Sequence, residues 1–145
     1  MSNLDSLPKS VPDPIVEFSI DVEGNVSKHK YSGNFKFKVP NLRARAMAEK
    51  EKTRLNEGLG KSIECPDCKK VIGNTLDETV LDFHAMYSYL RYSLVEYPEW
   101  WKNSNYGYEL YDSNVLTELY LKAVKTEADW LKEIWGDVSE PEPQK

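Results

Sequence analysis

The residues of this chain best suited to chemistry are two cysteines, Cys65 and Cys68, in the sequence Cys-Pro-Asp-Cys. Two thiolates at this spacing can form one edge of a tetrahedral zinc site, and the two lysines that follow are typical of a zinc knuckle. A structural site needs four ligands, and the other candidates are His84 and, less favourably placed, His29. Alternatively, two chains could each supply one cysteine pair. Structural zinc is therefore one cofactor hypothesis.

Two other interpretations of the cysteine pair stay open. Thiol–disulfide exchange would place the first cysteine at a helix N-terminus after a strand. Here the motif lies instead between two glycine-containing stretches, at residues 58–60 and 73–74. The remaining interpretation is a pair of unligated thiols in a loop, which a zinc assay on purified protein would distinguish from a metal site.

No catalytic constellation accompanies the cysteines. His84 falls on an amphipathic helix, where a histidine at the edge of a core is the commoner case, and Asp82 diverges from it because side chains two apart do not share a helix face. Residues 60–62 read Gly-Lys-Ser, but Leu55 occupies the position of the first glycine of a phosphate-binding loop. We therefore predict that the protein is not an enzyme.

A dense group of aromatic residues lies in the segment 94–111, which shows no helical or strand period. Rigid aromatics at this density either pin a connection onto a core or form a contact surface. If they form a surface, the candidate partner-binding residues are Tyr97, Trp100, Trp101, Tyr106 and Tyr108.

Composition limits the class of protein. The 145 residues are 40% hydrophobic and 12% aromatic, which predicts one globular domain. No apolar run approaches the roughly 20 residues that span a bilayer, and the N-terminus lacks the pattern of a secretory signal, so we expect no membrane and a cytoplasmic site. Residues 28–70 are mainly basic and residues from 77 onward mainly acidic, which would permit self-association. Nucleic-acid binding is disfavoured by a pI of about 5.1.

Alternating apolar residues predict three consecutive strands, 15–22, 26–31 and 35–39, joined by turns at 23–25 and 32–34. These form an antiparallel β-meander over 14–40, with an apolar face that needs a cover. We expect helices over 41–58, 75–97 and 113–135 to cover this apolar face. Asn41 caps the first helix, and a capping box over 75–78 opens the second.

The predicted fold is therefore α+β, an N-terminal meander packed against two to three helices, the last two forming an antiparallel pair. Residues 14–136 form the single domain, with a linker over 59–74 and the aromatic connection over 98–112. Residues 1–13 and 137–145 are expected to be flexible. The predicted core comprises Val16, Phe18, Ile20, Phe35, Phe37, Val39, Val80, Phe83, Tyr87, Leu90, Leu94, Leu119 and Val124.

Three segments resemble the tail assembly chaperones of long-tailed bacteriophages. They are the strand and helix entry from Tyr31 to Pro40 and on to Gly58, the helix 76–96 running into Tyr-Pro-Glu-Trp-Trp at 97–101, and Leu-Tyr-Asp-Ser-Asn-Val at 110–115. Together with the terminal helix that the third segment opens, they cover somewhat more than half of the chain. The Cys65–Cys68 insertion departs from that pattern.

The resemblance implies a non-enzymatic helper in the host cytoplasm that coats the helical tape-measure protein and keeps it soluble while the tail tube assembles. The opposite charges of the two halves would then support stacking of copies along that partner. The alternative in another class is a virion structural protein, such as a tail-completion or baseplate component. A third is a small zinc-binding adaptor.

Overall fold

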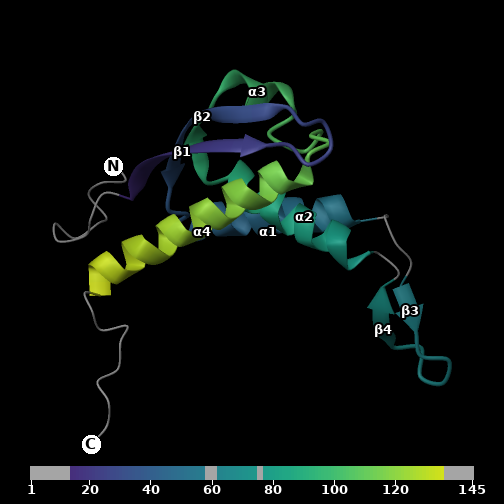
Figure 1. The fold of residues 1–145 in the computed structure, drawn as a ribbon. Coiled ribbons are helices and arrows are strands. Elements are labelled where there is room, and N and C mark those ends of the chain that lie inside the picture. The colour runs from purple at the N-terminus through teal and green to yellow at the C-terminus, as the bar shows by residue number, and fades with distance from the viewer. Residues whose placement is uncertain (1–13, 58–61, 75–76, 136–145) are drawn as a thin grey trace, which may run out of the picture.

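The computed structural model describes residues 14–57, 62–74 and 77–135, and confirms the α+β class (Figure 1). Its main sheet has three antiparallel strands in the order β1-β2-β5. The strands are β1 (Ile15–Glu23), β2 (Lys30–Lys38) and β5 (Leu94–Glu96). The helices are α1 (Leu42–Asn56), α2 (Glu78–Arg91), α3 (Glu99–Asn103) and α4 (Ser113–Trp135). A separate hairpin is formed by β3 (Ser62–Glu64) and β4 (Val71–Asn74).

The first two strands form a long hairpin rather than part of a three-strand meander. They pair without interruption from Ile15 opposite Lys38 to Glu23 opposite Lys30. The third strand of the sheet is β5, which follows α2 in the chain and pairs with β2. The sequence prediction of three consecutive strands is therefore wrong in its connections, although the antiparallel sheet itself is confirmed.

The predicted turn at 32–34 lies inside β2, and Gly33 explains why. Its backbone is extended, with φ of 159°, and it pairs with Ile20. A Cβ at this position would lie 2.4 Å from Cγ of Pro98. The glycine is therefore needed for the close approach of the proline ring to the strand, and not for a reversal of the chain.

The helices differ from their predictions mainly at the ends. Asn41 caps α1, its Oδ1 accepting the Ala44 N–H at 2.9 Å. The cap of α2 is Asp77, which accepts the Thr79 N–H at 2.7 Å. The predicted cap at position 75 falls outside the described residues.

The second helix also ends earlier than predicted, at Arg91 instead of residue 97. Hydrogen bonding to β2 draws the following residues into β5. Backbone pairing across the sheet thus takes precedence over the helical period of the sequence.

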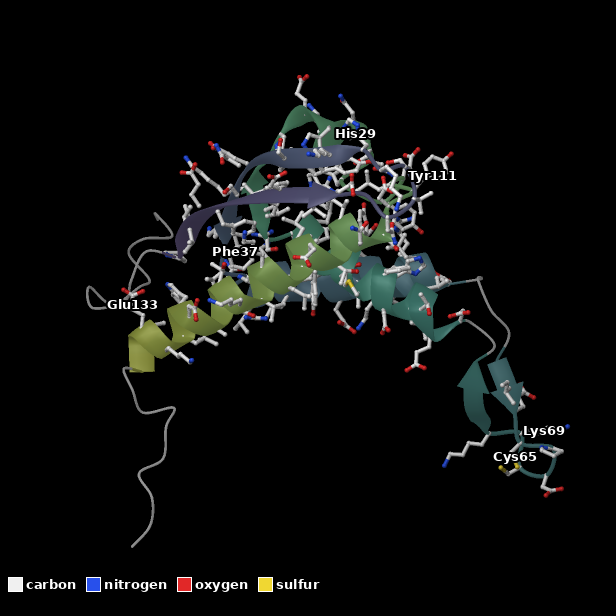
Figure 2. All side chains as sticks on the ribbon, in the orientation of Figure 1. His29, Phe37, Cys65, Lys69, Tyr111 and Glu133 are labelled. Atoms are coloured by element: carbon white, nitrogen blue, oxygen red, sulfur yellow. The ribbon has the colours of Figure 1, made fainter. Side chains whose placement is uncertain are left out.

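The core lies between the sheet and the helices. Helix α1 packs on α2, α2 packs on α4, and α4 packs on β1. Figure 1 shows α4 on the β1 side of the sheet and α3 on the β2 side. Phe37, labelled in Figure 2, is fully buried, and its ring packs at a tilt against Tyr89 of α2, with ring centroids 6.1 Å apart. The buried hydrophobic residues are Ile20, Phe35, Phe37, Val39, Tyr87, Leu90, Leu94, Trp101, Val115, Leu116, Leu119 and Ala123.

The other five residues of the predicted core are partly exposed: Val16, Phe18, Val80, Phe83 and Val124. Among the described helices, none is long and apolar enough to cross a membrane.

Candidate functional site

The aromatic connection packs largely onto the sheet. Trp101 in α3 is fully buried, and its ring meets Phe35 edge-on with centroids 6.0 Å apart. Gly107 allows this burial: its φ is 85°, and a Cβ there would lie 2.4 Å from the indole ring. Trp101 is therefore a core residue, and it is not accessible to a partner in this structure.

Trp100 is half-buried beside Trp101. Its Nε1 donates to the Ser32 carbonyl oxygen at 2.9 Å, and its ring lies 5.0 Å from that of Tyr31. The indole thus ties α3 to β2 through a hydrogen bond and a ring contact.

Tyr97 and Tyr106 form a second pair, with perpendicular rings 5.5 Å apart. The Arg91 guanidinium lies 3.8 Å from the Tyr106 ring centroid, which is a close cation–π contact. Burial, together with the hydrogen bond to Tyr106, raises the pKa of the Tyr97 hydroxyl. Both tyrosines are partly exposed and could contribute the edge of a contact surface.

Tyr108 is the most exposed of the five candidate aromatics, at 41%. Its hydroxyl lies 3.0 Å from Nε2 of His84, while Nδ1 of His84 lies 2.6 Å from Oδ1 of Asn56. Burial lowers the pKa of His84, which favours the neutral ring. Because both ring nitrogens are engaged, His84 is a structural link between α1, α2 and the aromatic connection and is poorly suited to bind a metal.

A pocket of about 280 Å³ lies beside this link. Its walls come from α2, the aromatic connection and the start of α4, and Tyr111 at its rim is 84% exposed. The lining residues are Val80, Phe83, His84, Gly107, Tyr108, Leu110, Tyr111, Asp112, Ser113 and Leu116. The lining is mostly apolar, and its ionisable residues His84 and Asp112 are already engaged in hydrogen bonds within the fold.

The cysteine pair lies at the turn of the β3–β4 hairpin, away from the aromatic residues. Cys65 is partly exposed, Cys68 is exposed, and both are free thiols. Within the part of the chain that the structure describes, no group of three or more His, Cys, Asp or Glu side chains is placed to hold a metal ion. Structural zinc therefore stays a prediction, and His84 is not brought into a group with the two cysteines.

A buried carboxylate that the sequence analysis missed joins the start of α4 to the β1–β2 turn. Asp112, just before α4, is fully buried. Its Oδ1 accepts the N–H groups of Val26 and Ser27 at 2.8 and 2.7 Å, and its Oδ2 accepts the hydroxyls of Ser27 and Tyr31 at 2.6 and 2.8 Å. These hydrogen bonds, led by that from the Ser27 hydroxyl, hold the pKa of Asp112 well below its usual range.

The site of Asp112 is structural, because the donors of these four hydrogen bonds all lie in the β1–β2 turn or in β2. An Asp before a helix is a common capping signal, and that signal could have marked the residue as important. Its partners more than 80 positions away could not be identified in this way.

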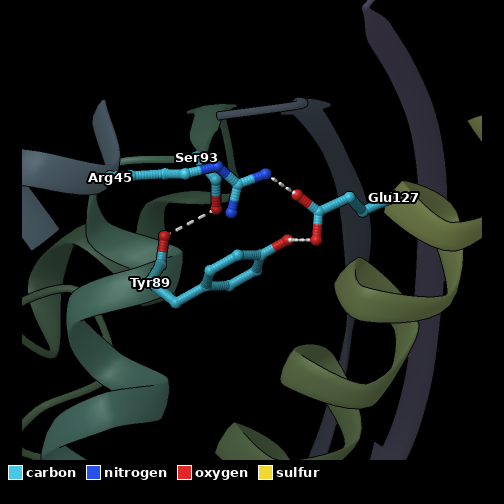
Figure 3. A network of polar contacts seen from close by, with 4 residues as sticks. All are labelled: Arg45, Tyr89, Ser93 and Glu127. Atoms are coloured by element: carbon cyan, nitrogen blue, oxygen red, sulfur yellow. Dashed lines mark hydrogen bonds and ion pairs between the residues drawn. The ribbon is translucent and has the colours of Figure 1, made fainter. Parts of the chain in front are cut away.

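A second polar network connects three helices (Figure 3). Glu127 of α4 forms an ion pair with Arg45 of α1 and accepts the Tyr89 hydroxyl of α2 at 3.3 Å. The Ser93 hydroxyl donates to the Tyr89 carbonyl oxygen at 2.7 Å. Burial, and then the charge of Glu127, raises the pKa of Tyr89 and keeps its hydroxyl protonated as a donor.

The structure also shows an open groove along α1 that the sequence analysis did not anticipate. It has a volume of about 810 Å³ and is bounded by α1 and by Tyr92 at the end of α2. The lining residues are Ala46, Met47, Glu49, Lys50, Glu51, Thr53, Arg54, Glu57 and Tyr92. Helix α1 has no buried residue, although it is 15 residues long.

Comparisons with protein-family models, with curated proteins and with solved structures each returned no significant match. The function must therefore be argued from the surfaces just described and from the sequence resemblance.

Proposed function

We propose that this protein is a non-enzymatic assembly chaperone that binds a long helical protein and keeps it soluble. The single observation that supports this best is the exposed face of α1 with its open groove. The resemblance of three sequence segments to phage tail assembly chaperones suggests the tape-measure protein as the partner.

The groove has the chemistry of a helix-binding surface. Ala46, Met47 and Tyr92 supply apolar contacts, and Met47 is 41% exposed. Methionine adapts its shape to different partners and is common on surfaces that bind many related segments. A chaperone that coats a long helical protein needs this tolerance, because successive segments of the partner differ in sequence.

Charges of both signs surround the apolar residues. Lys50 and Arg54 lie among the lining residues together with Glu49, Glu51 and Glu57. An amphipathic helix could bury its apolar stripe on Met47 and Tyr92 while its polar flanks meet these side chains. Burial of apolar surface would contribute about 25 cal/mol per Å² before the costs of association are subtracted.

The aromatic residues have a narrower role in this proposal than the sequence suggested. Trp101 is excluded by its burial, and Trp100 chiefly fixes α3 on the sheet. Tyr97, Tyr106 and the more exposed Tyr108 remain as candidates for the margin of a contact surface.

The test is co-expression with the longest helix-rich protein encoded just downstream, followed by a pull-down. We expect the partner to become soluble only with this chain, and we expect Met47→Glu to abolish that effect by placing a charge in the groove. Leu121→Glu is the matched control, since Leu121 is also an exposed apolar residue of a helix, at 56%, but does not line the groove.

A partner that is soluble alone, or insoluble in both cases, would contradict the proposal. If wild type and Met47→Glu make the partner soluble equally well, the groove on α1 is not the binding surface. Detection of the protein at fixed copy number in purified virions would instead support the alternative of a structural component.

A further inference from the structure

The β3–β4 hairpin holds Cys65 and Cys68 in a turn with defined backbone geometry. The Cys65 N–H donates to the Lys70 carbonyl oxygen at 2.8 Å, and the Lys69 N–H donates to the Cys65 carbonyl oxygen at 2.9 Å. Lys69 has a φ of 63°, in the left-handed region. The chain thus reverses immediately after the second cysteine, and both cysteines fall on the same turn.

Within this turn the two sulfur atoms converge. The backbone N–H groups of Cys68 and Asp67 are directed at the Cys65 sulfur, and the Cys68 thiol also donates a hydrogen bond to it. The thiolate is the form that binds metals, and N–H groups directed at a ligand sulfur are a common support around metal sites. The arrangement resembles one edge of a tetrahedral thiolate site.

The chain has too few soft ligands to complete such a site by itself. It contains two cysteines and two histidines in all. Both ring nitrogens of His84 are engaged by Asn56 and Tyr108. His29 packs against Tyr31 on the main sheet, and Figure 2 shows it at the opposite side of the molecule from Cys65.

We propose that two copies of this chain bind one Zn²⁺ between their hairpins, each copy supplying Cys65 and Cys68. Four thiols would release their protons to solvent and coordinate the ion as a closed Cys₄ site, which is a usual structural arrangement for zinc. The four thiolates and the ion carry a net charge of −2, and the exposed Lys69 and Lys70 of each copy lie directly beside them.

The position of the hairpin is compatible with this pairing. Figure 1 shows β3 and β4 away from the sheet and the four helices, and Figure 2 shows Cys65 and Lys69 at the end of the hairpin. Two hairpins could therefore meet at their turns without contact between the main bodies. Ile63 on β3, which is 45% exposed, would supply an apolar contact near the metal.

Zinc fits the observations better than a redox role. A reactive Cys-x-x-Cys pair normally places its first thiolate at a helix N-terminus. Here both cysteines lie in a turn between two short strands, and no helix begins within the turn.

The experiment measures zinc content and molar mass on the full chain, purified under reducing conditions with added ZnCl₂. We expect about half an equivalent of zinc per chain and a mass twice the 16.8 kDa of the monomer. Removal of zinc by a chelator should return the monomer, and ZnCl₂ should restore the dimer. Substitution with Co²⁺ should give the sulfur-to-metal charge-transfer absorption of a thiolate site.

Two variants complete the test. The double variant Cys65→Ser with Cys68→Ser should be a monomer without zinc, with unchanged far-UV circular dichroism. Asp67→Ala is the control, because Asp67 contributes its backbone N–H and not its exposed side chain to the turn, and it should retain both zinc and the dimer. One zinc per monomer, a dimer that survives both the chelator and the double substitution, or less than about a tenth of an equivalent of zinc would each overturn the proposal.

Discussion

At the scale of single residues, Asp112 shows how one side chain can join distant parts of this fold. Its two oxygens accept four hydrogen bonds from Val26, Ser27 and Tyr31. Gly24 makes room for the carboxylate, since a Cβ at this position would lie 2.3 Å from the Asp112 Cγ. Neutral asparagine could accept fewer of these bonds, and its amide nitrogen would face donors.

This arrangement predicts a specific dependence of stability on pH. The folded-state pKa of Asp112 is depressed, so its contribution is fully present above the unfolded-state pKa of about 3.9. It is lost progressively as the pH falls from about 4 toward the folded-state pKa. Asp112→Asn should lower the melting temperature clearly at pH 7, and should leave the variant with a shallower loss of stability between about pH 4 and pH 2.

Thermal unfolding followed by circular dichroism at a series of pH values checks this prediction. Asp82→Asn serves as the control, because Asp82 is an exposed carboxylate on α2. Parallel curves for wild type and Asp112→Asn over the acid range would show that the hydrogen bonds to Asp112 are not the source of the acid sensitivity.

The residue scale also shows the limits of sequence reasoning about the candidate site. The aromatic cluster and the cysteine pair could be identified because they are local in sequence. The burial of Trp101 could not be predicted from the sequence, because it depends on Gly107 and Phe35 both contacting its ring in the folded chain. Likewise, nothing local to His84 indicates that Asn56 and Tyr108 occupy its two nitrogens.

At the scale of elements, periodicity was a good guide to where helices and strands occur and a poor guide to their connections. The alternation of residues 15–22 and 35–39 correctly indicated strands that cover a core. The sequence predicts a turn at Gly33 because glycine tolerates turn conformations, whereas in the structure this glycine accommodates Pro98. The three residues of β5 become a strand through pairing with β2, which a window along the sequence does not detect.

The polar network that connects α1, α2 and α4 gives a prediction at the scale of elements. Tyr89→Phe removes the hydroxyl that donates to Glu127 and leaves the ion pair with Arg45 in place. The hydrogen bond is long, at 3.3 Å, so we expect the free energy of unfolding to fall by about 0.5–1.5 kcal/mol. Urea denaturation at neutral pH measures the difference.

Tyr120→Phe is the matched control for that substitution. The Tyr120 ring also contacts Tyr89, with centroids 5.4 Å apart, whereas the hydroxyl that donates to Glu127 is that of Tyr89. Its effect should stay within about 0.5 kcal/mol. Equal losses for the two variants would assign the effect to ring packing instead of to the hydrogen bond.

At the scale of the whole molecule, the described residues form a main body of one sheet and four helices, with a small hairpin apart from it (Figure 1). The proposed helix-binding groove lies on α1 and the proposed zinc link lies on the hairpin. They can therefore be tested independently of each other.

The separation predicts that the hairpin can be removed without unfolding the rest. Replacement of residues 62–74 by a short Gly/Ser linker should change the free energy of unfolding of the main body by less than about 1 kcal/mol. Tryptophan fluorescence is a suitable measurement, because the four tryptophans, at positions 100, 101, 130 and 135, all lie outside the replaced segment. Loss of cooperative unfolding would show that the hairpin supports the core.

The contact between Asp112 and the β1–β2 turn also has a consequence for the order of events during synthesis. Ser27 leaves the ribosome 85 residues before the carboxylate that it binds. Local pairing can form the hairpin early, but its turn gains the anchor only when most of the chain has been translated. We therefore expect the nascent N-terminal hairpin to open and close repeatedly, and to become fixed only once the start of α4 has emerged.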